Sequence, residues 1–393
     1  MRNEKWAAPL LPLDLKNAKR ILVVGENAIK MMTVGGGSSS LKVQKEILPL
    51  DGLTSHLSLL TSHLSIDFAR GYVGDTVQSY NGVTVGRSIA ESRSAEELRQ
   101  EAVEKAKGAD YVIVFGGLNK SDYQDCEGHD RKEYGLPYGQ DALVEALAKV
   151  NKNIVFVNIS GNAVAMPWAK QVPAIVQGWF IGSEAGEALA SVLCGEVNPS
   201  GKLPFTWFER LEDCGAHALN AFPGVWRDDY KTIDEEYKEG IYVGYRWADL
   251  PDKVKSEKFK VKSEKPLFPF GHGLSYTTFE LGKPQVKADA DSSRFTFHLS
   301  LKNTGSRAGA ETVQLYVSDK KVSVDRPVKE LKAFQKVFLQ PGESRDVTLT
   351  IGRDALSFYD EAKGQWTAEP GEFEALIGTS AGQISHHISF TLK

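Results

Sequence analysis

Tyr111-Val-Ile-Val-Phe-Gly-Gly117 runs almost directly into Lys120-Ser-Asp-Tyr-Gln-Asp-Cys-Glu-Gly-His-Asp-Arg131. The first stretch is an unbroken apolar run, which is typical of a strand buried on both faces of a parallel sheet. The second stretch is a polar loop that carries Asp122, Asp125, Glu127 and Asp130. Because the carboxyl ends of strands in an open α/β sheet face the ligand crevice, these acidic side chains are predicted to meet a substrate.

Short apolar runs alternate with helical patterns through the first half of the chain. Besides the run at 109–116, continuous apolar runs predict strands at residues 20–25, 154–159 and 174–179. Residues 94–107 and 140–150 instead space their apolar side chains as one face of a helix, with charged residues opposite. The alternation predicts a layered α/β sandwich domain over residues 18–214.

The second half of the chain has a different pattern. Residues 215–278 are rich in aromatic residues and glycine without sustained periodicity, which predicts a connecting segment that buries rings such as Trp226, Tyr237 and Trp247. From residue 279 to residue 393, short alternating strands separated by turn sequences predict an all-β sandwich. Its strands are expected at residues 294–301, 312–317, 329–339, 345–351 and 371–377.

Composition excludes several classes of partner. The formal net charge of -4 over 393 residues gives no electrostatic attraction for nucleic acid or for an anionic membrane, so a neutral or mildly polar partner is favoured. No apolar run approaches the roughly 20 residues of a membrane span, and the N-terminus lacks the apolar segment of a signal peptide. Cys126, Cys194 and Cys214 lack zinc-ligand spacing, and three unpaired thiols are favoured over one disulfide.

The glycine and serine run Gly35-Gly-Gly-Ser-Ser-Ser40 follows the first predicted strand. A phosphate cradle is disfavoured, because neither GxGxxG nor GxxxxGK[ST] is present. Two alternatives stay open, a flexible turn and a loop whose small residues allow a bulky ligand to approach the backbone.

Glu127 is the strongest catalytic candidate in the acidic loop. A glutamate in a polar loop is usually a solvated side chain. Here the adjacent Gly128 allows the backbone a wider range of conformations, so the loop can place Glu127 at a site. A general acid must be protonated when it meets its substrate, so the pKa of Glu127 is expected to be raised by burial or by a neighbouring carboxylate. Asp130 and Arg131 are expected to form an ion pair that shapes the loop, and Cys126 is expected to pack rather than to act as a nucleophile.

The run Asp125-Cys-Glu-Gly-His-Asp-Arg131, followed by Leu136-Pro137 and Gln140-Asp-Ala-Leu143, resembles the hallmark of glycoside hydrolase family 3. The resemblance continues in order through 35–39, 158–160, 178–186, 198–204, 237–246 and 268–276. It implies a C-terminal α/β sandwich followed by a fibronectin type III-like sandwich. It also implies retaining hydrolysis of β-glucosides or related β-linked oligosaccharides, by an aspartate nucleophile and a glutamate acid/base.

The resemblance assigns residue roles in this sequence. Glu127 matches the general acid/base, while Asp130 and Arg131 are structural residues near the site. Gly36, Ser38, Ser39 and Asp122 are the predicted substrate contacts. The implied chemistry requires no metal and no cofactor.

The sequence departs from the family pattern at its start. Family enzymes of this layout begin with a (β/α)₈ barrel of roughly 250 residues or more, which carries the nucleophile. Residues 1–17 resemble the connector that follows that barrel, so no residue of this chain is assigned as nucleophile. Retention needs two carboxyl groups about 5 to 5.5 Å apart, so the chain alone is expected to be inactive.

A barrel domain, in cis or in trans, is therefore the expected partner. The face on which a barrel docks is expected to be apolar, which also allows a homodimer. The compartment stays open, either periplasmic or secreted, or otherwise cytoplasmic. Two alternatives to a glycosidase remain: a non-catalytic carbohydrate-binding or scaffolding protein, and a nucleotide-binding α/β protein.

Overall fold

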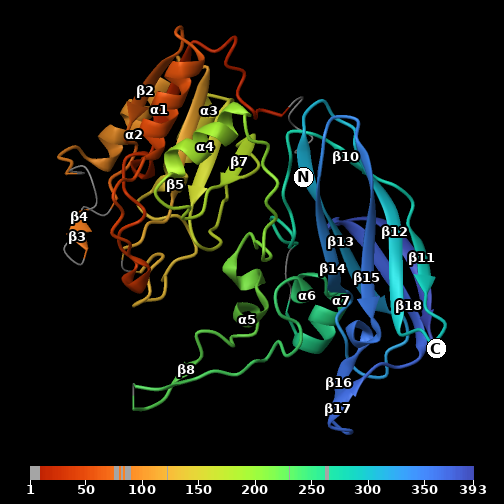
Figure 1. Ribbon diagram of the computed structural model, residues 1–393. Coiled ribbons are helices and arrows are strands. Elements are labelled where there is room, and N and C mark those ends of the chain that lie inside the picture. Colours follow the sequence, from red (N-terminus) through yellow and green to blue (C-terminus); the bar gives the residue numbers. More distant parts are fainter. Residues whose placement is uncertain are drawn as a thin grey trace. The chain divides into compact units, whose positions relative to one another are not determined.

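The chain folds into two units, Met1–Val197 and Asn198–Lys393 (Figure 1). The computed structural model describes residues 9–74, 79–80, 83–84, 90–121, 123–229, 231–261 and 265–393. The first eight residues of the predicted connector 1–17 lie outside these ranges. The predicted domain boundaries at residues 18, 215 and 279 stay predictions.

A parallel sheet of five strands forms the centre of the first unit, in the order β2-β1-β5-β6-β7. Its strands are β1 (Arg20–Val24), β2 (Ser65–Ala69), β5 (Tyr111–Gly117), β6 (Ile154–Ile159) and β7 (Ala174–Gln177). The four predicted strands are confirmed. Edge strand β2 is an addition that sequence reasoning missed, because it is only partly buried and has no continuous apolar run.

Helices cover this sheet (Figure 1). They are α1 (Pro49–Leu60), α2 (Ala95–Ala106), α3 (Gln140–Val150) and α4 (Ala185–Cys194). Helices α1 and α4 pack together over one face, where leucines of both helices join the alternate side chains of β1, β5 and β6 in one core. Helices α2 and α3 pack together and also contact strands of the sheet. The two predicted helices are confirmed, and with them the layered α/β class of this part of the chain.

The buried side chain of Gln140 ties the start of α3 to the end of β5. Its Oε1 accepts a hydrogen bond from the Gly117 N–H at 2.8 Å, and its Nε2 donates to the Gly117 carbonyl at 2.8 Å. Both backbone groups of Gly117 are thus satisfied away from water, as buried polar groups must be. The polar loop between these two elements therefore leaves and re-enters the core at fixed points.

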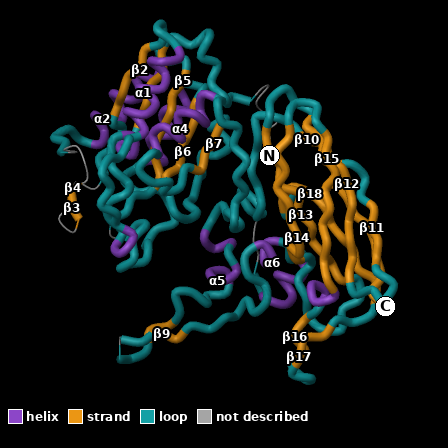
Figure 2. Tube along the Cα trace, viewed as in Figure 1, coloured by secondary structure: helices purple, strands orange, loops and turns teal. Residues whose placement is uncertain are grey.

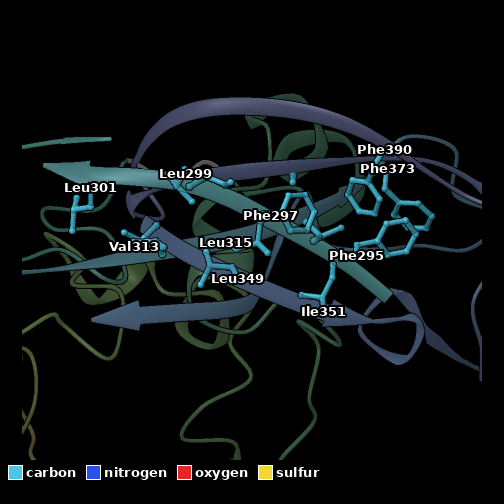
Figure 3. Packing of buried hydrophobic residues seen from close by; sticks show 14 of the residues in the cluster. Phe295, Phe297, Leu299, Leu301, Val313, Leu315, Leu349, Ile351, Phe373 and Phe390 are labelled. Carbon is cyan, nitrogen blue, oxygen red and sulfur yellow. The ribbon is translucent and has the colours of Figure 1, made fainter. Parts of the chain in front are cut away.

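Two antiparallel sheets form the sandwich of the second unit. One holds β10 (Phe279–Leu281), β11 (Gln285–Ala288), β12 (Arg294–Asn303) and β15 (Ser344–Gly352), and the other holds β13 (Gly309–Asp319), β14 (Glu330–Leu339), β18 (Gly371–Ser380) and β19 (Gln383–Leu392). Alternate side chains of these strands point inward and make a core rich in phenylalanine (Figure 3). The predicted strands and the all-β class are confirmed, with β10, β11 and β19 added.

Aromatic rings in the predicted connecting segment differ in how far they are buried. Trp247 and Tyr242 are buried in a small apolar cluster of the second unit, as expected. Trp226 and Tyr237 are 56% and 82% exposed, so the prediction that these two rings are buried is wrong. Trp226 lies on the short hairpin of β8 (Val225–Trp226) and β9 (Ile233–Asp234), which extends from the unit as an arm (Figure 2). No helix in the described ranges combines the length and apolar character of a membrane span.

We predict that Gln140→Leu lowers the free energy of unfolding by about 2 kcal/mol or more, because it leaves the buried N–H and carbonyl of Gly117 without partners. Urea-induced unfolding followed by circular dichroism measures the loss. Gln100→Leu is the matched control, since Gln100 is an exposed helical glutamine, and its effect should stay within about 0.5 kcal/mol. Equal effects of the two substitutions would refute the role assigned to Gln140.

Candidate active site

Three loops that follow neighbouring strands meet at the carboxyl edge of the parallel sheet. They are the glycine and serine run after β1, the acidic loop after β5 and the turn after β6. Together with Phe180 and Gly182, which follow β7, they border an open pocket of about 740 Å³. Its lining includes Gly36, Ser38, Ser39, Lys120, Asp125, Cys126, Glu127, His129, Asp130, Arg131, Gly161, Asn162 and Phe180. The topology therefore brings the acidic loop and the glycine run to one site.

Glu127 is held by the glycine and serine run through three hydrogen bonds. Its carboxylate Oε2 accepts from both the Ser38 N–H and the Ser38 hydroxyl, each at 2.6 Å. Its own N–H donates to the Gly36 carbonyl at 3.2 Å. These bonds fix both the backbone and the carboxylate of Glu127, although the residue lies at the surface.

The glycines of this run are required by the backbone and by the close approach of Glu127. Gly36 and Gly37 have φ angles of +79° and +82°, which side chains disfavour. A Cβ atom on Gly37 would lie 2.6 Å from the Glu127 Oε2. The small residues of the run therefore allow the Glu127 carboxylate to approach the backbone closely, and the two interpretations made from the sequence both stay open.

The expected protonation behaviour of Glu127 is corrected by these contacts. The Ser38 hydroxyl and the Ser38 N–H stabilise the charged form and lower the pKa of Glu127 below its usual value. The side chain is exposed, so desolvation raises its pKa only weakly. The prediction of a raised pKa is therefore wrong for the chain as it stands, because the contacts with Ser38 outweigh the weak desolvation.

Asp125 anchors the acidic loop to the turn after β6. Its two carboxylate oxygens accept from the Gly161 N–H at 2.7 Å and from the Asn162 side-chain amide at 2.5 Å. Burial raises the pKa of Asp125, and these two hydrogen bonds partly oppose the rise. Asp125 is therefore a structural carboxylate of the site.

The side chain of Arg131 contacts Ala163 and Tyr134 and does not pair with Asp130. Its Nη2 donates to the Ala163 carbonyl at 2.7 Å, and its guanidinium lies 5.6 Å from the centre of the Tyr134 ring. Burial lowers the pKa of Arg131, while the charge of Asp125 opposes this. Within the described loop, no ion pair joins Asp130 to Arg131, so that prediction is wrong: the charge of the half-buried guanidinium interacts with that of Asp125, and the Asp130 side chain is exposed.

Lys120 is a residue of the pocket that sequence reasoning quoted but gave no role. Its Nζ donates to the Ser39 carbonyl at 3.0 Å and lies 6.0 Å from the centre of the Phe180 ring. Burial of its half-exposed side chain lowers the pKa of Lys120. Its position directly behind a buried strand was the signal that could have identified it.

The other predicted site residues have mixed outcomes. Gly36, Ser38 and Ser39 line the pocket, but the Ser38 hydroxyl is bound to Glu127 and the Ser39 hydroxyl to the Gly36 carbonyl at 3.2 Å. Asp122 lies outside the described residues.

Cys126 is partly exposed at the pocket, with its Sγ 3.4 Å from the His129 carbonyl. All three cysteines are unpaired, as favoured from the sequence. Across the described ranges, no cluster of three metal-ligating acids, histidines or cysteines occurs.

Comparison with known proteins gives two family matches. A family described as "Glycosyl hydrolase family 3 C-terminal domain" matches residues 1–245, and a "Fibronectin type III-like domain" matches residues 311–381. A β-glucosidase of Bacteroides ovatus is 47% identical across 97% of this chain and 48% of its own length. A thermostable β-glucosidase of Acetivibrio thermocellus is 45% identical across 74% of this chain and 36% of its own length. The chain thus spans about half or less of the length of these relatives.

Solved structures give the same answer. A β-glucosidase from Bifidobacterium adolescentis superposes with a TM-score of 0.80 at 33% identity, across 98% of this chain and 50% of that one. A β-glucosidase from Streptomyces venezuelae, solved in complex with D-glucose, superposes with a TM-score of 0.82 at 26% identity, across 98% of this chain and 57% of that one.

We predict that Ser38→Ala raises the pKa of Glu127, because it removes a hydroxyl that stabilises the charged carboxylate. Carbon-13 NMR titration of glutamate carboxyl groups measures the change, and the signal missing from Glu127→Gln gives the assignment. Ser39→Ala is the matched control, since the Ser39 hydroxyl bonds to a backbone carbonyl instead. A pKa of Glu127 that is the same with and without the Ser38 hydroxyl would contradict the contact.

Proposed function

Because this chain belongs to glycoside hydrolase family 3, we propose that it is the acid/base-bearing C-terminal half of a retaining β-glucosidase. Glu127 is the proposed general acid/base for hydrolysis of terminal β-D-glucosyl or related residues. The observation that carries the proposal is the Glu127 carboxylate, which Ser38 holds at the rim of an open pocket. The names of the relatives, all β-glucosidases, support the choice of reaction.

The contacts of Glu127 suit a proton donor. Ser38 occupies one carboxylate oxygen, Oε2, and no hydrogen bond from the described residues reaches the other, Oε1. Oε1 can therefore carry the proton to the oxygen of the leaving group, while Oε2 keeps the head group in place. In the second step the same oxygen can accept a proton from water, as microscopic reversibility requires.

A domain that covers the pocket would change the pKa of Glu127. An exposed carboxylate with a lowered pKa is deprotonated near neutral pH, and so it makes a poor acid. A domain that covers the pocket would exclude water, and a nucleophilic carboxylate about 5 to 5.5 Å away would repel its charge. Both effects raise the pKa toward the range in which Glu127 can donate a proton.

A (β/α)₈ barrel is the proposed domain that covers the pocket and supplies the aspartate nucleophile, either in cis or as a second chain. Asp125, the half-buried carboxylate of the same pocket, is already bound to the Gly161 N–H and the Asn162 amide, which makes it an unsuitable nucleophile. Half of a carboxylate pair cannot complete the double displacement.

A non-catalytic carbohydrate-binding or scaffolding protein is the second candidate. The open pocket and the charged, exposed state of Glu127 favour it, since both allow a sugar to bind without being cleaved. The two candidates differ in what happens when a barrel is supplied: only the first gains turnover.

We predict that the purified chain alone hydrolyses an aryl β-glucoside no faster than buffer, because the proposed nucleophile belongs to the barrel. Steady-state release of the nitrophenol from 4-nitrophenyl β-D-glucoside measures this. A turnover comparable with that of a full-length relative, and unchanged after further purification, would contradict the proposal.

Once a family barrel is supplied, we predict that Glu127→Gln lowers kcat/KM by about 10²-fold or more for a glucoside with a poor leaving group. A glucoside with a dinitrophenolate leaving group should keep most of its glycosylation rate, since that group departs without a proton. Glu133→Gln, at an exposed glutamate of the same loop, is the matched control and should leave both rates unchanged. Equal losses for both leaving groups would assign Glu127 a structural role.

A further inference from the structure

Two large aromatic rings are displayed on a small hairpin of the second unit. Strands β16 (Phe358–Asp360) and β17 (Gln365–Thr367) form a two-stranded sheet of their own, which projects from one end of the sandwich (Figure 1). Tyr359 and Trp366 lie directly opposite each other in its register. Their ring centres are 5.8 Å apart with an interplanar angle of 74°, and the side chains are 52% and 70% exposed.

The base of the hairpin is fixed to the sandwich. Phe358 lies under the guanidinium of Arg326, 5.6 Å from it. Arg326 also donates to the carbonyl of the buried Leu356 at 3.0 Å, and it forms ion pairs with Asp319 and Glu330 at 3.3 and 3.2 Å. Such a network holds the residue before Tyr359 in place. The aromatic pair is thus presented on a rigid support and not on a loose loop.

The turn of the hairpin is also held, by an ion pair of 2.6 Å between Lys363 and Asp360. With Glu361, the turn carries two acids and one base, so it gives no attraction for polyanions. The hairpin therefore combines an exposed aromatic pair, carried on an anchored base, with a turn of nearly balanced charge.

A purely structural role does not account for this arrangement. A cross-strand aromatic pair stabilises a hairpin, but that role does not require side chains that are 52% and 70% exposed. Tyrosine and tryptophan are instead the residues that recognition surfaces use, because they offer a large apolar face and a polar edge with few rotatable bonds.

We propose that Tyr359 and Trp366 form an accessory site that binds a β-linked glucan chain. β-Linked glucose has equatorial hydroxyls, so each ring face presents axial C–H bonds that fit the negative face of an aromatic ring. The choice of glucan as the ligand rests on the proposed function, while the binding site itself rests on the hairpin.

Isothermal titration calorimetry of the full chain with cellohexaose and with laminarihexaose tests the proposal. We expect saturable binding of at least one of them, and a loss of affinity of about tenfold or more in Trp366→Ala and in Tyr359→Ala. Trp366→Phe keeps an aromatic pair across the hairpin and should retain part of the affinity. Phe334→Ala, at a phenylalanine 66% exposed on β14, is the matched control and should bind as the parent chain does.

Three results would overturn the accessory site. The first is the absence of heat with either oligosaccharide at millimolar concentration, and the second is equal binding by the parent chain, Trp366→Ala and Tyr359→Ala. The third is concentration-dependent dimerisation that Trp366→Ala abolishes, which would make the hairpin an interface between copies.

Two variants separate this inference from the proposed function: Trp366→Ala tests binding at the hairpin, and Glu127→Gln tests the activity that a barrel restores. Binding that survives in a protein whose restored activity ignores Glu127 would keep the accessory site and reject the glycosidase assignment. Restored activity that depends on Glu127, without any binding at the hairpin, would do the reverse.

Discussion

The donation of two hydrogen bonds by Ser38 to one oxygen of Glu127 is the contact on which the site depends. It joins two loops that are 89 residues apart in the sequence, and it converts a solvated glutamate into a fixed carboxylate. Hydrogen bonds to a charged group are stronger and shorter than those between neutral groups, so this contact orders both loops. The glycine at position 37 is required for it, since a Cβ there would overlap the carboxylate.

Sheet topology explains why these loops meet. Strand β1 lies beside β5, and β5 lies beside β6, so the loops that leave their carboxyl ends are neighbours although other elements separate them in the sequence. Gln140 then fixes the far end of the acidic loop by bonding both backbone groups of Gly117. In an open α/β sheet this edge is the usual place for a ligand site.

Sequence patterns predicted what depends on local periodicity. The strand at 154–159 and the helix at 140–150 were found because their apolar residues form an uninterrupted run or a helical stripe. Strand β2 was missed because an edge strand that is only partly buried has neither signal. The position of Glu127 in a loop at the sheet edge was predictable, but its lowered pKa was not, since Ser38 is distant in sequence. The same holds for Arg131, which bonds to Ala163 across the fold.

Together, these features support the proposal that Glu127 donates the proton and that a barrel supplies the attacking carboxylate. The most direct test is to trap the intermediate with a 2-deoxy-2-fluoro-β-glucoside in a mixture of this chain and a family barrel, followed by peptide mass spectrometry. If this chain supplies only the acid/base, the glycosyl label should be on an aspartate of the barrel and on none of residues 1–393. A label on any side chain of this chain would contradict that account.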